Sequence, residues 1–236
     1  MRVRMAGFAL ALLTGCPAPA RGDWAFAGFL GASFTQPNTI VLDRPAAGTS
    51  VSLAGVHYAG RSFEAPPYYG YRAARLGERV GVEGEFVHLK AYANAAGPVT
   101  ARGGVDGRQI DGRVPLGDVL ERFSMSHGLN LVLANVVWYP GGRRGAVAAS
   151  VRGGAGVAVP HGESTVDGLE QEQYEVSSLA AQGAFAVELR ARGRLRLLAE
   201  YKLTTAAPHV SVSGGTVSGR FVSQHLVFGV GWHTRS

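Results

Sequence analysis

Histidine and carboxylate side chains are the residues of this chain that could carry chemistry. The sequence has seven His residues and 17 Asp and Glu residues in 236 positions. Imidazole and carboxylate groups that lie close together can bind a metal ion or act as a general base. The candidates that we expect at one end of the molecule are His57, His88, His127, His161, His209, His225, Asp43, Glu64, Asp106, Asp111, Glu163 and Asp167.

Within this set, the candidate catalytic residues are His88, His225 and Glu64. His88 and His225 fall in segments with strand character, and a strand holds a side chain more rigidly than a loop does. The sequence specifies no cofactor, although a divalent metal ion would suit a histidine–carboxylate set if the protein is an enzyme. Exposed loop histidines need no such role, so the sequence leaves both explanations open.

Other short motifs point less clearly to a site. Ser lies near His in "SMSH" (124–127) and in "HGES" (161–164). The Asp-Gly pairs of "RGGVDGRQIDGR" (102–113) fit tight turns better than a calcium loop, because the ladder of oxygen ligands is missing. The Gly-rich runs are not followed by Lys-Ser/Thr at a helix start, which excludes a phosphate loop. The formal net charge is +6, but the Arg residues are scattered singly, which argues against a nucleic-acid partner.

The elements that would position these residues are β-strands. Apolar and polar residues alternate with a period of two, and no apolar run after the N-terminus has helical periodicity. In the last strand, for example, Phe228, Val230 and Trp232 alternate with small or polar residues. The segments with strand character are 23–35, 67–77, 79–93, 127–140, 146–160, 178–192, 194–207 and 221–233.

The connections between these segments alternate in length. Short turns are expected at 77–79, 141–145 and 192–194. Long connections are expected at 36–66, 94–126, 161–177 and 208–220, with a short helix at 115–124. This asymmetry is typical of outer-membrane barrels, which have short periplasmic turns and longer extracellular loops. We therefore predict an all-β fold: an eight-stranded antiparallel up-and-down transmembrane β-barrel over residues 23–235, with four long extracellular loops.

Charged and aromatic residues support the membrane assignment. Charges of both signs at strand centres suit a narrow lumen filled by ion pairs, and aromatic residues near strand ends suit the two membrane interfaces. The expected lumen charges are Glu83, Glu85, Arg152, Glu188, Arg190, Arg196, Glu200 and Lys202. The expected interface aromatics are Trp24, Tyr68, Tyr69, Trp138, Tyr139 and Trp232.

The N-terminus is typical of a secretory signal. "MRVR" is a basic start and "MAGFALALL" is a short apolar stretch, so residues 1–20 are expected to be removed on export. Alternatively, "LTGC" resembles the lipobox of bacterial lipoproteins, which would place a lipid on Cys16. Both alternatives predict an exported protein.

The strand pattern over 23–233 resembles the small OmpA/OmpX-type outer-membrane barrels of Gram-negative bacteria. The last strand is similar to that family's assembly signal, although "HTRS" follows Trp232 where the family usually ends at the aromatic residue. The resemblance implies a monomer that is integral to the outer membrane, contacts its lipids and lipopolysaccharide, and is inserted by the barrel-assembly machinery.

A second resemblance concerns "GRSFEAPPYYGYRAAR" (60–75) and "GVEGEFVHLKAY" (81–92), which are similar to segments of lipid A oxidase-type outer-membrane proteins. It implies an enzyme that uses oxygen to oxidise the proximal glucosamine of lipid A in the outer leaflet. The His-x-Ser-Asn run of outer-membrane lipid A deacylases is absent. The alternative function is a non-enzymatic barrel that supports the envelope, mediates adhesion or binds partners through its loops.

Overall fold

The computed structural model describes residues 22–234. The expected signal peptide (1–20) and the alternative lipid site at Cys16 lie outside these residues. No helix within the described part of the chain is long and apolar enough to cross a membrane.

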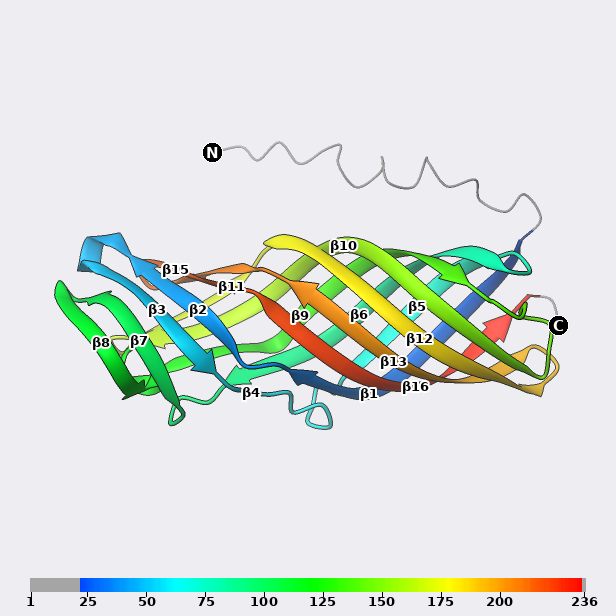
Figure 1. Cartoon of the computed structure of the whole chain (residues 1–236), viewed down its shortest axis with the longest axis horizontal. Helices are drawn as coiled ribbons and strands as arrows, with labels where there is room; N and C mark the ends of the chain where they lie inside the picture. Colours follow the sequence, from blue (N-terminus) through cyan, green and yellow to red (C-terminus); the bar gives the residue numbers. More distant parts are fainter. Residues whose placement is uncertain (1–21, 235–236) are drawn as a thin grey trace, which may run out of the picture.

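Eight long strands form a closed barrel (Figure 1). They are β1 (Asp23–Thr35), β5 (Tyr69–Leu76), β6 (Val80–Ala93), β9 (Arg122–Trp138), β10 (Val147–Val166), β12 (Ser178–Arg192), β13 (Leu195–Ala206) and β16 (Phe221–His233). Each pairs antiparallel with the next, and β1 also pairs with β16 along most of its length, which removes both sheet edges. The predicted fold is confirmed.

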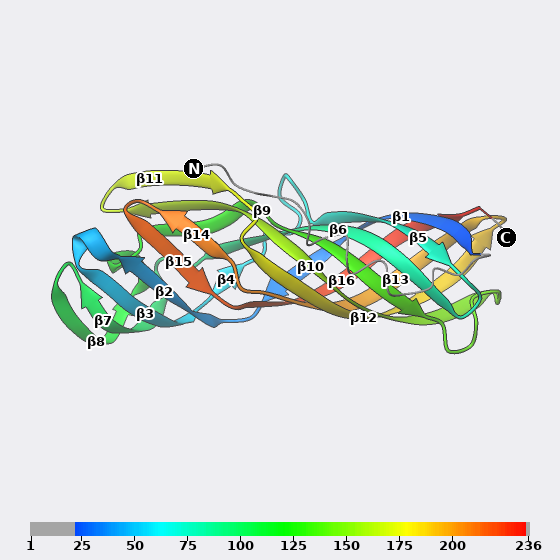
Figure 2. The ribbon, with the colours of Figure 1, turned by 90° about the horizontal axis from the view of Figure 1, so that it is seen from above.

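The predicted long loops contain strands of their own, which extend the molecule beyond the barrel on one side (Figures 1 and 2). The additional strands are β2 (Asn38–Arg44), β3 (Thr49–Val56), β4 (Tyr58–Ala59), β7 (Pro98–Val105), β8 (Arg108–Pro115), β11 (Leu169–Tyr174), β14 (His209–Val212) and β15 (Gly215–Gly219). Six of them form a second sheet in the order β14-β15-β2-β3-β7-β8. We call this sheet the extracellular extension.

Tight turns explain how these hairpins close. Asp106 and Gly107 between β7 and β8, and Asp167 and Gly168 between β10 and β11, all have positive φ. Paired positive φ angles are the requirement of the hairpin turn that favours Asp-Gly. Of the two Asp-Gly pairs that the sequence predicts as turns, Asp106-Gly107 is one, whereas Asp111-Gly112 lies within β8 and pairs with β7. The expected helix at 115–124 reduces to a single 3-10 turn, Leu116–Asp118, because the chain from Arg122 onward joins β9.

The barrel lumen is filled by ion pairs. Arg72 donates to both carboxylate oxygens of Glu200, at 2.8 and 3.0 Å, and to Glu85 at 3.0 Å. Arg152 also donates to Glu200, at 2.9 Å. The buried charged side chains of the lumen are Arg72, Arg152, Arg196, Lys202, Glu83, Glu85, Glu188 and Glu200. Above this layer the upper barrel and the extracellular extension share an apolar core that includes Ile40, Leu53, Leu89, Leu116 and Met125.

Three residues do not lie where the sequence predicted them: Arg190 was expected in the lumen, and Tyr68 and Tyr139 were expected at the membrane interfaces. Arg190 is exposed at the end of β12, where it donates to the carbonyl of Arg144 in a short connection. Tyr68 and Tyr139 are fully buried, and the Tyr139 hydroxyl donates to Glu188 at 2.8 Å. Because neighbouring residues of an extended chain face opposite ways, Tyr69 and Trp138 take the outer surface and their neighbours turn inward.

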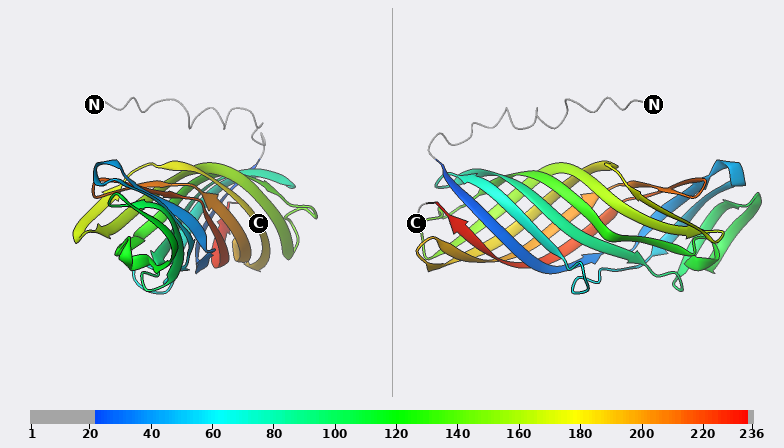
Figure 3. Two further views of the ribbon diagram at one scale, coloured as in Figure 1. Left: turned by 60° about the vertical axis from the view of Figure 1, so that its left-hand side comes forward. Right: turned by 180° about the vertical axis from the view of Figure 1, so that it is seen from behind.

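The outer face of the barrel carries a belt of exposed apolar side chains. Trp24, Trp138 and Trp232 mark one edge of this belt, which we call its lower edge. It is at the end of the barrel where β1 begins and β16 ends, and Figure 3 shows these two strand ends side by side. The rest of the belt includes Phe26, Leu30, Val80, Val132, Val136, Val147, Val151, Phe185, Leu189, Leu195, Leu197, Leu203, Leu226, Phe228 and Val230. A closed barrel with an apolar outer surface and a charged, side-chain-filled lumen spans a membrane. The short turns then face the periplasm and the extension faces outward.

Candidate functional site

A group of polar side chains lies on the outer surface of the barrel wall, directly above the apolar belt. They come from β5, β6, β9, β10 and β11, which neighbour one another in the sheet. We call this group the outer-wall cluster: Tyr69, His88, Arg122, Ser126, His127, Asn130, His161, Glu163 and Tyr174.

An irregularity in the pairing of β9 with β10 creates the centre of this cluster. Their register shifts between Pro160 and Glu163. Met125 and Leu129 are both buried, so regular alternation would also turn His127 inward. The bulge instead leaves the His127 side chain 60% exposed and in contact with Glu163. A local backbone feature therefore brings this histidine to the outer surface.

Gly128 makes this approach sterically feasible. Its φ is +112°, in the region that favours glycine. A Cβ atom at this position would lie 2.4 Å from His88 Nδ1 and 2.7 Å from Asn130 Oδ1. Any other residue would push apart the contact between β6 and β9 at the cluster.

Glu163 is the carboxylate at the centre of the cluster. Its side chain is 8% exposed. Arg122 Nη2 donates to Oε2, while Ser126 Oγ donates to Oε1. His127 Nδ1 lies 3.0 Å from the same Oε1 atom. The carboxylate is therefore held in one orientation from both sides.

Two histidine rings lie next to this carboxylate. The ring centroids of His127 and His161 are 4.8 Å apart, and Tyr174 packs its ring edge-on to His161 at 5.5 Å. The ligand atoms of His127, His161 and Glu163 all lie within 4.8 Å of one another. Such a donor set is able to hold a metal ion.

His88 forms the second half of the cluster. Its Nδ1 lies 2.8 Å from Asn130 Oδ1, and Asn130 Nδ2 donates to the carbonyl of Val159 and to the Tyr174 hydroxyl, both at 3.3 Å. Because the amide oxygen can only accept, Nδ1 carries the hydrogen and Nε2 of the neutral ring has a free lone pair. His88 is buried, and its Nε2 atom has no hydrogen-bond partner within residues 22–234.

The cluster lies near the upper edge of the apolar belt. A strand that rises about 3.3 Å per residue and tilts by about 40° advances about 2.5 Å per residue along the barrel axis. Counted along β9 from Trp138, Val132 is then about 15 Å, Asn130 about 20 Å and His127 roughly 27 Å higher. Since the apolar band of an outer-membrane barrel is about 25 Å tall, the cluster lies where lipid headgroups meet acyl chains in the outer leaflet.

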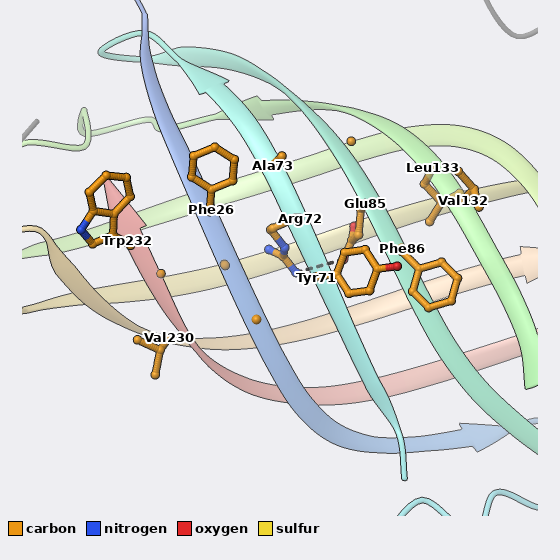
Figure 4. Close-up of a pocket in the computed structure, with 14 residues that line it drawn as sticks. Phe26, Tyr71, Arg72, Ala73, Glu85, Phe86, Val132, Leu133, Val230 and Trp232 are labelled. Atoms are coloured by element: carbon orange, nitrogen blue, oxygen red, sulfur yellow. Dashed lines mark hydrogen bonds and ion pairs between the residues drawn. The ribbon is translucent and has the colours of Figure 1, made fainter. Parts of the chain in front are cut away.

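A groove of about 730 Å³ runs along the lipid-facing wall below the cluster (Figure 4). Its floor is low because the residues there are small: Gly28 on β1, Ala73 on β5 and Gly84 on β6. Its rims include four aromatic side chains: Phe26, Trp232, Tyr71 and Phe86. Figure 4 shows these rings on the outer side of the ribbons.

Aromatic contacts connect the rim of this groove with the cluster. Tyr71 stacks on Phe86 with centroids 5.0 Å apart, and Phe86 contacts Tyr69 at 6.0 Å. Tyr69 in turn stacks on His88 at 4.9 Å. A continuous surface of rings therefore leads from the lipid-facing groove to the polar group above it.

The three residues proposed as catalytic from the sequence lie in different places. His88 is part of the outer-wall cluster. His225 faces the lumen, where it is fully buried, contacts the Thr204 hydroxyl at 2.9 Å and packs against Tyr68. Glu64 lies in the connection between β4 and β5, with its side chain 64% exposed and paired with Arg61. The structure thus puts His88 and His225 on opposite faces of the wall.

No protein-family model matches the chain, and no curated protein sequence matches it. Among solved structures, the chain is similar to the outer membrane protein OprG from Pseudomonas aeruginosa, with 14% identity over 91% of this chain and 97% of that chain and a TM-score of 0.46. It is also similar to Neisserial surface protein A, with 10% identity over 90% of this chain and 97% of that chain and a TM-score of 0.43. A third similar structure is the outer membrane protease OmpT from Escherichia coli, with 7% identity over 93% of this chain and 99% of that chain and a TM-score of 0.41. At these values the comparisons carry no argument about activity.

The chain's own architecture gives its location. A closed barrel of antiparallel strands with an apolar belt and an aromatic lower edge is the form in which proteins are built into the bacterial outer membrane. The protein is an integral outer-membrane β-barrel, and the outer-wall cluster is on its lipid-facing side.

Proposed function

We propose that the protein is an enzyme that acts on lipid A or lipopolysaccharide in the outer leaflet of the outer membrane. The observation that carries this proposal is the position of the outer-wall cluster. Polar side chains on the lipid-facing side of a membrane barrel are costly unless they serve a purpose. Here the buried His88, Ser126, Asn130 and Glu163 lie against exposed His127, Arg122 and Tyr174 at the level of the headgroups, on the side of the wall away from the lumen.

The groove supports a lipid substrate. Its small floor residues and aromatic rims would take an acyl chain, and the ring contacts from Tyr71 to His88 lead from that chain to the headgroup. A glycolipid with several acyl chains would be held at both ends, which fixes the position of its sugar relative to the cluster.

His88 is the residue that we propose as general base. Its Nδ1–H is fixed by Asn130, which leaves an unused lone pair on Nε2; this atom is buried, so a bound lipid must displace the side chains that cover it before Nε2 accepts a proton from a sugar hydroxyl. An oxygen-dependent oxidation of the proximal glucosamine fits this arrangement. It would agree with the resemblance of residues 60–92 to lipid A oxidase-type proteins, a range that includes Tyr69 and His88.

The second candidate function is a non-enzymatic one, and the extracellular extension favours it. Its six strands present the edge strand β8 and exposed charged residues such as Arg102 and Asp111 to the outside. An exposed edge strand can pair with a partner chain. In that case the outer-wall cluster would only anchor the barrel among charged headgroups.

Mass spectrometry of lipid A distinguishes the two. Cells that express the protein and cells that lack it are grown with and without oxygen, and their lipid A is compared. A mass gain of one oxygen atom that needs both the protein and air supports the proposed oxidation. Unchanged lipid A, with the barrel folded in the outer membrane, would contradict the enzymatic proposal and favour the binding function.

A further inference from the structure

We propose that His127, His161 and Glu163 form a binding site for one divalent first-row transition-metal ion. The inference deepens the proposed function, because it supplies that site with a metal, but the binding itself does not depend on lipid A being the substrate. The argument rests on the spacing of the ligand atoms, on how Glu163 is held and on the exclusion of a serine-based alternative.

The ligand spacing matches a coordination sphere. Two ligand atoms that are each about 2.1 Å from an ion, at right angles, lie about 3.0 Å apart. Glu163 Oε1 and His127 Nδ1 are 3.0 Å apart. The ligand atom of His161 completes a set that lies within 4.8 Å, and the proposal requires the partly exposed His161 side chain to rotate toward the ion.

One carboxylate oxygen, Oε1, lies beside His127 and Ser126 at the position proposed for the ion. Arg122 donates a hydrogen bond to Oε2 of Glu163, and Oε1 points toward the two histidines. A ligating carboxylate whose other oxygen is hydrogen-bonded is typical of metal sites, because the outer partner fixes its orientation. Ser126 Oγ lies against the same Oε1 atom and offers a further oxygen at the ion's position.

A Ser-His-Glu relay does not explain these contacts. In such a relay the serine hydroxyl bonds one ring nitrogen and the carboxylate bonds the other. Here Ser126 Oγ lies 3.0 Å from His127 Nδ1, and Glu163 Oε1 contacts that same nitrogen. Because Ser126 and Glu163 both contact Nδ1 of His127, they cannot pass a proton through the ring, whereas three mutually adjacent ligand atoms suit a cation.

The donor types select the class of ion. Imidazole nitrogen favours iron, copper, nickel and zinc over magnesium and calcium, which prefer oxygen ligands. Two histidines and one carboxylate leave open positions, a set that is used by non-haem iron enzymes. His127 is exposed, so the open side of the ion would face the headgroup region, where a lipid could reach it.

Cobalt binding to the purified full-length barrel in detergent tests the site. We expect Co²⁺ to bind with a stoichiometry of one and to give a visible absorption spectrum. His161→Ala and Glu163→Gln should each weaken binding by at least about 100-fold, because each removes one of three ligands. His209→Ala is the matched control, since His209 is an exposed histidine of the extension, and it should bind as the unaltered protein does.

Three results would overturn the proposal: no binding at about 1 mM Co²⁺, equal affinity in the two ligand variants and the control, or full displacement of Co²⁺ by equimolar Ca²⁺. Heat-dependent gel mobility checks that every variant is folded. Lipid A analysis separates the two claims. Metal binding without any lipid A change would support the metal site and contradict the enzymatic function. Lipid A modification that survives in both ligand variants would support the enzymatic function and show that the reaction does not use the ion.

Discussion

The ion-pair network of the lumen gives the most quantitative prediction, through the substitution Arg72→Met. The four basic side chains Arg72, Arg152, Arg196 and Lys202 face four Glu side chains, so the network is neutral as a whole. The Arg72 side chain is 3% exposed and makes three hydrogen bonds to Glu85 and Glu200. Its loss leaves a net charge of −1 in a space without bulk water.

The expected cost is about 3–5 kcal/mol, the usual result of removing one partner of a buried ion pair. The lower end is favoured because each carboxylate keeps another cation. Lys202 still contacts Glu85, and Arg152 still donates to Glu200 at 2.9 Å. We therefore expect the free energy of unfolding to fall by about 3 kcal/mol.

Urea unfolding of the barrel in lipid vesicles measures this change. The exposed Trp24, Trp138 and Trp232 report the loss of lipid contact through their fluorescence. Arg190→Met is the control, since Arg190 is exposed at the barrel rim, and it should change stability by no more than about 0.5 kcal/mol. The double variant Arg72→Met/Glu200→Gln restores neutrality and should recover about 1 kcal/mol or more. A loss of less than about 1 kcal/mol for Arg72→Met, equal to that of the control, would refute the network as a source of stability.

Three further predictions concern the outer wall. Asn130→Leu removes the acceptor that fixes the His88 tautomer, so lipid A turnover in vesicles should fall about 10- to 100-fold while the barrel stays folded. Unchanged turnover would show that His88 does not need this hydrogen bond. Gly84→Leu fills the groove floor, where an added Cβ meets nothing within 4 Å, so the apparent KM for lipid A should rise. The matched control is Gly153→Leu, at an equally open site outside the groove, and it should leave the KM unchanged. Equal KM values for the two variants would argue against acyl-chain binding. Gly156→Val would place a Cβ 1.9 Å from the Val132 carbonyl oxygen, so we expect the free energy of unfolding to fall by about 1–3 kcal/mol in the same assay. Unchanged stability would mean that β9 and β10 do not approach this closely.

Much of the barrel could be predicted from the sequence because a membrane imposes a simple rule on strands. Lipid outside and ion pairs inside force strict alternation, which is visible in segments such as 194–204. The hairpins of the extracellular extension were missed because water covers their outer faces, so they need no apolar belt. The turn at Asp106-Gly107 was predicted, but the strands β7 and β8 on either side of it were not.

The site was only partly predictable for a different reason. His88 lies on a regular part of β6, and its strand position made it a candidate. His127, His161 and Glu163 were among the histidine and carboxylate candidates, but their meeting could not be predicted, because it depends on the register of β9 against β10. A bulge changes that register by an amount that no alternation pattern shows. The available signal was that "SMSH" directly precedes the apolar part of one strand and "HGES" directly follows the apolar part of its antiparallel neighbour, which puts both motifs at the same end of the pair.

The central claim is that the outer-wall cluster modifies a glycolipid of the outer leaflet. The most direct measurement is mass spectrometry of lipid A after incubation, in air, with vesicles that contain either the purified protein or its Glu163→Gln variant. We expect a mass gain of one oxygen atom with the unaltered protein and at least about a 100-fold slower reaction with the variant, since Glu163 is the centre of the cluster. Equal modification by both proteins, or none by either when both barrels are folded, would contradict the account.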